Sequence, residues 1–224
     1  MSAENGELSP ERFIKELWRT VPPDWMAEFF LIKYQPTAEN PKAKTIGCLV
    51  YEVGRVLAGW PAAARALQRL NSQGHNIHPC VNPRFRRIAG GRGKNSDVNV
   101  FVALWIDIDF HGQETAVRKA FAELLERLTA AGIRPSIIVE SGRGIHAYWL
   151  LDKPYPVKDA RPRCAGLQKE AMTCDVAEAG SDPINDPSRV LRLPGTNNLK
   201  DPSAPHPCIV VEASYKRYPL SAFD

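Results

Sequence analysis

The feature that most constrains this chain is an apolar run from Val102 to Phe110 that two aspartates interrupt. Its length and its content of Ile, Leu, Val and Trp predict a strand that is buried on both faces. Because side chains alternate along a strand, Asp107 and Asp109 lie on the same face. A buried carboxylate is costly unless an opposite charge compensates it, so we expect a cation beside this pair.

That cation is expected to be a divalent metal ion, because the run contains no Lys or Arg. Mg²⁺ and Mn²⁺ prefer oxygen ligands, and two carboxylates on one face can share such an ion. A structural role is the alternative, in which one aspartate caps the next turn and the other pairs with a distant arginine. An isolated Asp-x-Asp motif does not decide between the two.

The composition is that of a globular protein, with 44% hydrophobic and 24% charged residues in a chain of 224, enough for one large or two small domains. The net charge of +4 permits an anionic partner without requiring one. Five cysteines without a CxxC pair indicate reduced thiols and a cytoplasmic location. We find no signal peptide and no apolar run that could span a membrane, so no membrane partner is expected.

Hydrophobic periodicity and turn residues predict helices and strands along the chain. We expect helices at 9–18, 61–73, 114–131 and 158–172, and strands at 29–34, 46–53, 76–81, 102–110, 135–140, 146–151 and 208–211. Pro162 is expected to confine the start of the last helix. The strand, helix and strand up to residue 140 predict a βαβ-like crossover or a split version of it. The short link Ser141–Ile145 then predicts an antiparallel hairpin.

A basic, glycine-rich stretch leads into the aspartate strand. Its five cations lie within eleven residues that contain no acid: Arg84, Arg86, Arg87, Arg92 and Lys94. The glycines and asparagines predict an exposed loop. Such loops are usually solvated surface, but the proximity of a predicted metal-binding strand favours contact with the phosphates of DNA.

The link of the predicted hairpin has the composition of a phosphate-binding turn. Gly142 permits a positive φ or a close approach of the backbone, so N–H groups can face an anion. Ser141 and Arg143 add a hydroxyl and a cation, and His146 opens the next strand, where its ring can reach the same ligand. The alternative is an ordinary turn with a surface arginine and a buried histidine.

The stretch from Gly180 to Lys200 mixes acids with arginines. Asp182 and Asp186 can each supply a further carboxylate. Arg189 and Arg192 share one face if the segment is helical. The alternative is a surface loop in which these acids and arginines pair with one another. Together with the two earlier stretches, this one completes what two-metal phosphoryl transfer needs: carboxylates for two ions and cations for a triphosphate.

In this order the motifs resemble those of the archaeo-eukaryotic primase superfamily, and most closely the primase-polymerase domains of plasmid, phage and CRISPR-associated replication proteins. The resemblance covers roughly residues 76–200, and the chain before it matches only in outline. It is carried by Asp107-x-Asp109, by Ser141-Gly-x-Gly-x-His146, and by Asp182 followed by Arg189-Val-Leu-Arg192-Leu-Pro-Gly-Thr-x-Asn198.

The resemblance implies roles for individual residues. Two Mg²⁺ or Mn²⁺ ions would be bound by Asp107, Asp109 and Asp182, and these residues together with His146 would form the catalytic set. Because Ser181 precedes Asp182 where the superfamily has a hydrophobic residue, Asp186 remains an alternative third ligand. The triphosphate of the incoming nucleotide would be contacted by Ser141, Gly142, Arg143, His146, Arg189 and Arg192.

The resemblance also implies an α+β fold. In it, an RRM-like antiparallel sheet with flanking helices is fused to a smaller N-terminal αβ unit, with the catalytic cleft between them. Residues 1–224 would form a single primase-polymerase catalytic domain. Its N-terminal αβ subdomain would span residues 1–98, and its RRM-like catalytic subdomain residues 99–224.

The implied activity is template-dependent nucleotidyl transfer by a DNA primase-polymerase that starts or extends strands. Its partners would be a single-stranded DNA template and primer, NTPs or dNTPs, and further domains or a helicase in a longer parent protein. Structural zinc, which some members carry, is not expected, because the spacing of His75, His78 and Cys80 fits no standard pattern. The alternatives are a non-catalytic replication-initiator module and a metal-dependent glycosyltransferase, which also uses Asp-x-Asp.

Overall fold

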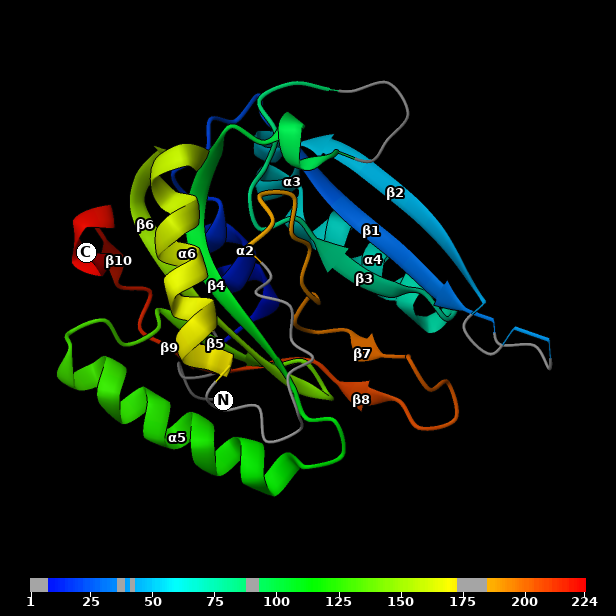
Figure 1. Ribbon diagram of the computed structural model, residues 1–224. Helices are drawn as coiled ribbons and strands as arrows, with labels where there is room; N and C mark the ends of the chain where they lie inside the picture. Colours follow the sequence, from blue (N-terminus) through cyan, green and yellow to red (C-terminus); the bar gives the residue numbers. More distant parts are fainter. Residues whose placement is uncertain (1–7, 36–38, 41–42, 88–92, 173–184) are drawn as a thin grey trace, which may run out of the picture.

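The computed structural model describes residues 8–35, 39–40, 43–87, 93–172 and 185–224. Figure 1 shows two sheet units beside each other, with helices packed against both. The helices are α2 (Pro10–Leu17), α3 (Val53–Ala58), α4 (Trp60–Ser72), α5 (Glu114–Ala130) and α6 (Val157–Met172), with the 3₁₀ turns η1 (Asn95–Asp97) and η2 (Leu220–Phe223). The strands are β1 (Met26–Tyr34), β2 (Lys44–Glu52), β3 (Asn76–Pro79), β4 (Val100–Asp109), β5 (Ile137–Glu140), β6 (Gly144–Pro156), β7 (Asn197–Asn198), β8 (His206–Pro207), β9 (Ile209–Ala213) and β10 (Arg217–Tyr218). No helix in the described ranges is long and apolar enough to cross a membrane.

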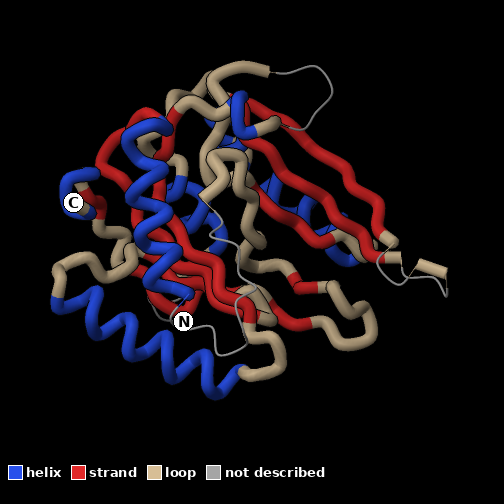
Figure 2. Tube along the Cα trace, viewed as in Figure 1, coloured by secondary structure: helices blue, strands red, loops and turns tan. Residues whose placement is uncertain are grey.

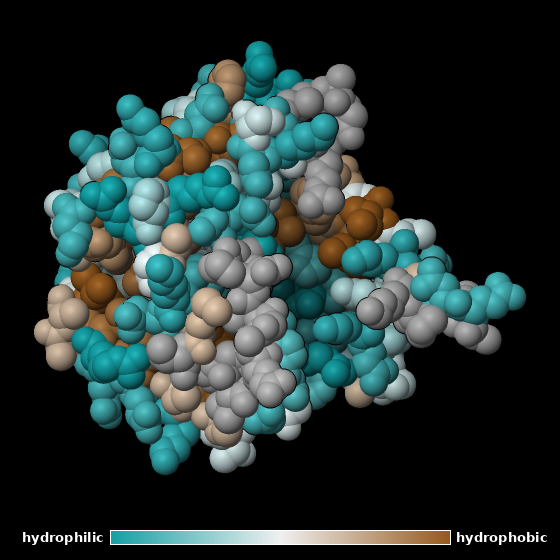
Figure 3. Space-filling view, in the orientation of Figure 1, coloured by the Kyte–Doolittle hydropathy of each residue, from teal (hydrophilic) through white to brown (hydrophobic). Residues whose placement is uncertain are grey.

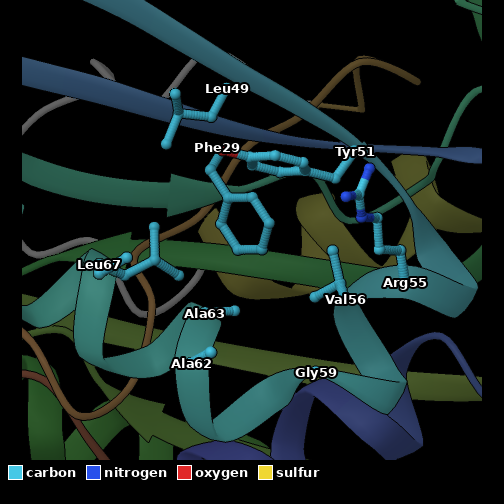
Figure 4. Close-up of a pocket in the computed structure, with 10 residues that line it drawn as sticks. Phe29, Leu49, Tyr51, Arg55, Val56, Gly59, Ala62, Ala63 and Leu67 are labelled. Atoms are coloured by element: carbon cyan, nitrogen blue, oxygen red, sulfur yellow. The ribbon is translucent and has the colours of Figure 1, made fainter.

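The smaller sheet has β1 at its centre, with β2 and β3 antiparallel on either side. Helices α3 and α4 cover one face, where Phe29, Leu49 and Leu67 line an apolar pocket of about 300 Å³ (Figure 4). Successive side chains of β1 point to opposite faces, so Phe30 and its strand partner His78 lie on the other face. That second face borders the larger sheet.

The larger sheet is built around β6, which pairs antiparallel with β4 on one side and with β5 on the other. Strand β9 continues the sheet antiparallel to β5, and β10 runs parallel to a short part of β6. The pairing of β5 with β6 confirms the predicted hairpin. The mixed architecture, with antiparallel sheets and flanking helices, confirms the predicted α+β fold class.

Helices α5 and α6 lie beside each other against the larger sheet (Figure 2). Phe121 of helix α5 and Ile138 of β5 line the same pocket between this helix and the sheet. Ile138 is paired with Ala147, whose side chain points away from the carboxylates. Helix α6 packs along β4, where Gln168 Nε2 donates a hydrogen bond to the Trp105 carbonyl oxygen at 2.9 Å.

An extended segment, residues 189–193, runs along the free edge of β3 and connects the two sheets. The Leu191 N–H donates to the Pro79 carbonyl oxygen at 3.2 Å. The Leu193 N–H donates to the Ile77 carbonyl oxygen at 2.9 Å. The segment is therefore not helical, which was the condition under which its two arginines were expected to share a face. Hydrogen bonds to a strand edge fix it in the extended form.

Several short elements were not predicted, namely α3, β7, β8 and β10, because two to six residues are too few for a periodic pattern. Helix α6 begins at Val157 and contains Pro162, so the proline does not confine its start. A proline near a helix start removes a single intrahelical hydrogen bond. The division of the chain at residue 98 stays a prediction.

The close approach of β4 and β6 predicts the effect of two glycine substitutions. A Cβ at Gly144 would lie less than 3.0 Å from the Ile108 carbonyl oxygen, closer than real Cβ atoms approach. We expect Gly144→Ala to lower the free energy of unfolding by about 1–3 kcal/mol. Gly166→Ala, in α6 where a Cβ meets nothing within 4 Å, should raise it by about 0.5–1 kcal/mol. Chemical denaturation measures both, and equal stabilities of the two variants would contradict the strand packing.

Candidate active site

The two aspartates lie at the end of β4 and face β6. Asp107 is paired with His146 and Asp109 with Gly144 in the strand register. The His146 Nε2 atom lies 3.4 Å from Asp107 Oδ1. The side chain of Asp107 is 22% exposed, and Asp109 is exposed to solvent. The structure thus brings together three of the residues that the sequence analysis placed in one site.

Burial and mutual repulsion leave the carboxylates with incompletely compensated charge. Burial raises the pKa of Asp107, although the nearby Arg189 and Arg192 act in the opposite direction. The pKa of Asp109 is raised by burial and by the charge of Asp107. A divalent cation would relieve both effects, and carboxylate oxygens are its preferred ligands. The donor chemistry of this pair therefore fits Mg²⁺ or Mn²⁺.

His146 is a neutral imidazole at physiological pH. Burial, reinforced by Arg192, lowers its pKa to about 3. Its Nδ1 atom is buried and has no hydrogen-bond partner among the described residues. Across the cleft, His78 of β3 is similar: burial and the charge of Arg192 lower its pKa to about 3, and its buried Nδ1 is likewise without a partner in the described part. His78 is thus a second uncharged ring, close to His146 and Arg192.

The arginines reach the site from the segment along β3. Arg192 donates from NH1 to the Asn76 side-chain oxygen, and burial lowers its pKa. Arg189 donates from NH2 to Asp186 Oδ2 at 3.3 Å. Both arginines lower the pKa of Asp107, so both lie within electrostatic range of it although their segment is extended.

The turn between β5 and β6 is closed by backbone hydrogen bonds. The Ser141 N–H donates to the Gly144 carbonyl oxygen at 2.9 Å. Gly142 has φ +86, and a Cβ there would lie 2.7 Å from the Cβ of His206, so glycine is required. Arg143 is 37% exposed and its NH2 lies 3.8 Å from Asp201 Oδ2. It is available to a ligand at the cost of one weak, exposed ion pair.

A pocket of about 320 Å³ extends from Asp109 over this turn. Asp109, Arg143 and Gly142 line it, together with residues that were not predicted to have a role: His111, Lys200 and His206. Lys200 and His111 lower the pKa of Asp109, so they lie close to it. Lys200 ends the third motif-bearing stretch, which was the available signal, whereas the two histidines lie in no motif. Figure 3, in the orientation of Figure 1, shows a largely hydrophilic surface that is hollowed between the two sheet units.

The third metal ligand stays a prediction. Asp182 lies outside the described residues. Asp186 has both oxygens engaged, Oδ1 with Asn95 Nδ2 at 3.2 Å and Oδ2 with Arg189. Within the described ranges no three His, Cys, Asp or Glu side chains form a group that could hold a metal ion. The structure therefore does not join Asp186 to the carboxylate pair, and it assembles no zinc site from the described His and Cys residues.

The assignment of Arg84 to the DNA-binding surface is wrong. Its side chain is 1% exposed and forms an ion pair with the equally buried Glu28 of β1. A buried guanidinium paired in this way is not available to phosphates. Arg86, Arg87 and Lys94 are exposed. The fifth predicted cation, Arg92, lies outside the described residues.

Comparison with known proteins identifies solved structures that have a similar fold. No family model and no curated protein sequence matches the chain. The AEP domain of the cyanophage S-2L primase-polymerase has a TM-score of 0.60 at 18% identity, over 96% of this chain and 94% of that one. Primase RepB′ gives 0.58 at 14% identity, and this chain spans 61% of its length. The RepB′ catalytic domain in complex with initiator DNA gives 0.52 at 14% identity, over 96% of this chain and 91% of that domain.

The chain therefore has the fold of an archaeo-eukaryotic primase (AEP) domain, and the resemblance seen in the sequence is confirmed at the level of the fold. The TM-scores arise at identities of 14% to 18%, so they speak for the arrangement of elements and not for single residues. The roles of the site residues rest on the geometry described above.

The low pKa of His78 predicts how stability depends on pH. The folded chain holds His78 neutral down to about pH 3, whereas the unfolded chain protonates it below about 6.5. Its contribution to stability is present above pH 6.5 and is lost as the pH falls towards 3. Between pH 7 and pH 5 the wild type should lose about 2 kcal/mol more than His78→Gln. Denaturant titrations at both pH values measure this, and parallel losses would contradict the burial of a neutral ring.

Proposed function

We propose that this chain is a DNA primase-polymerase, which joins nucleoside triphosphates on a single-stranded DNA template by starting new strands and extending primers. The observation that carries the proposal is the assembly at the cleft: the Asp107 and Asp109 carboxylates, the neutral ring of His146 and two arginines. An AEP fold makes nucleotidyl transfer the reaction class to test first. The cysteines in the described ranges form no disulfide with one another, which agrees with a cytoplasmic enzyme.

In this proposal Asp107 and Asp109 hold two Mg²⁺ or Mn²⁺ ions with a third carboxylate, for which Asp182 is the candidate. The ions would activate the attacking 3′-hydroxyl and neutralise the leaving pyrophosphate. Their charge would keep both carboxylates ionised in spite of burial. His146, being neutral, orients ligands through hydrogen bonds and adds no charge of its own.

The proposed triphosphate site is formed by the β5–β6 turn and the arginine segment. Ser141 and Gly142 offer the turn, Arg143 an exposed guanidinium, and Arg189 and Arg192 two further cations. Guanidinium groups suit phosphate oxygens because they donate in a planar fork. Electrostatic compensation of this kind is strongest where a group is shielded from water, as the partly buried Arg192 is.

The proposed DNA contacts are electrostatic and lie on the exposed cations Arg86, Arg87 and Lys94. Arg92 remains part of this proposal on sequence grounds. The solved RepB′ catalytic domain is in complex with initiator DNA, which supports a nucleic-acid partner for a chain of the same fold. Neutralising phosphates with such residues makes affinity strongly salt-dependent.

Asp107→Asn tests the catalytic assignment. Loss of one carboxylate should lower primer extension with Mn²⁺ by at least the roughly 10–100-fold that even an outer partner costs a metal site. Without metal the variant should be at least as stable as the wild type, because a carboxylate whose pKa burial raises destabilises the folded state at neutral pH. Primer-extension assays and metal-free denaturation measure the two effects.

Two controls accompany this variant. Asp152→Asn makes the same change on an exposed residue six positions along β6 from His146, about 20 Å away, and should keep full activity. Mn²⁺ should raise the melting temperature of the wild type and of Asp152→Asn but not of Asp107→Asn. Undiminished synthesis by Asp107→Asn would refute the proposed catalytic centre.

Arg143→Gln tests the triphosphate site. Removing one charge-assisted hydrogen bond should raise the nucleotide KM by about 10-fold or more, with a smaller change in kcat. Arg134→Gln is the matched control, since Arg134 is 41% exposed and pairs with Glu212 on the far edge of the sheet. Steady-state kinetics with varied nucleotide concentration distinguish the two. An unchanged KM in Arg143→Gln would remove this residue from the site.

A further inference from the structure

Phe85 is an exposed aromatic residue in the basic stretch and has no part in the chemistry proposed above. Its ring is 41% exposed, unlike most large apolar side chains among the described residues. Residues 83–96 include no acid. An apolar ring in a cationic surface matches a ligand that combines flat apolar faces with negative charge.

The backbone on both sides of Phe85 is anchored to β1. Glu28 and Arg84 form an ion pair whose side chains are 4% and 1% exposed. The Gly93 N–H donates to Glu28 Oε1 at 2.9 Å. Arg84 also exchanges two backbone hydrogen bonds with Met26, at 2.7 and 2.9 Å. Because Phe85 follows Arg84 directly, buried interactions determine where it is presented.

The ring of Phe85 is paired with a cation on the same surface. The guanidinium carbon of Arg86 lies 5.2 Å from the ring centroid, within the range of a cation–π contact. Arg87 follows in sequence and is exposed, and Lys94, which follows the anchored Gly93, is exposed as well. Ring and guanidinium together present planar surfaces that are bordered by positive charge.

We propose that Phe85 is a base-stacking site for single-stranded nucleic acid, with Arg86 beside the ring and with Arg87 and Lys94 at the neighbouring phosphates. This inference rests on the proposed function and adds to it a residue that recognises the unpaired state of the template. Every base has a π-face, so stacking is tolerant of sequence. In a duplex the bases stack on one another, so the ring would favour single strands over duplexes.

Fluorescence anisotropy with a labelled dT20 oligonucleotide, and with a 20-base-pair duplex, tests the proposal. Phe85→Ala should weaken dT20 binding by about 10-fold and leave duplex binding unchanged. Phe85→Leu keeps an apolar side chain without a π-face and should be equally weak, whereas Phe85→Trp should restore binding. Ile209→Ala, at another exposed apolar residue (45% exposed) on β9, is the matched control and should bind like the wild type.

Salt dependence separates stacking from charge. Phe85→Ala should keep the wild-type slope of log Kd against log salt, whereas Arg87→Gln should lower that slope by about 0.7 for the lost phosphate contact. Phe85→Leu binding as well as the wild type, or equal losses for dT20 and duplex, would overturn the stacking site. If the wild type itself binds no dT20 and extends no primer, the proposed function fails instead.

Discussion

The antiparallel register between β4 and β6 is the constraint on which the candidate site depends. It places Asp107 opposite His146 and Asp109 opposite Gly144. A slip of one residue would turn both carboxylates to the face that α5 covers. Gly144 protects this register, since the Ile108 carbonyl occupies the space that a side chain would need. Backbone pairing between β4 and β6 thus determines which side chains meet at the end of β4.

Burial then determines the charges at that position. It raises the pKa of Asp107 and Asp109 and lowers that of His146, so burial opposes charge on each group, and an ionised carboxylate pair would gain no compensation from the ring. Arg192 is close enough to interact electrostatically with all three residues, but its own side chain is partly buried. In a low dielectric such an arrangement favours binding of further positive charge. In the proposed function, the same terms that cost the ligand-free fold stability would favour a bound divalent cation.

Local sequence patterns were sufficient for the longer strands, for the hairpin, and for the shared face of Asp107 and Asp109. They were not sufficient where a residue depends on a partner far along the chain. Arg84 resembles a surface cation because its partner Glu28 belongs to another strand. His78 lies in no motif, and its position follows from how the two sheets meet. The order of motifs predicted the fold, but the third carboxylate was open in the sequence and stays a prediction.

The arginine segment, residues 189–193, is hydrogen-bonded to the smaller sheet, whereas the charges of its arginines act on the carboxylates of the larger sheet. Residues 189–193 are bonded to β3, and Arg192 is bonded to Asn76 of the same strand. Any rotation of the smaller sheet away from the larger one would carry two positive charges off the carboxylates. A hinge motion between the two sheets would therefore change the electrostatic potential at Asp107. A ligand that binds these arginines would in turn select one angle between the sheets.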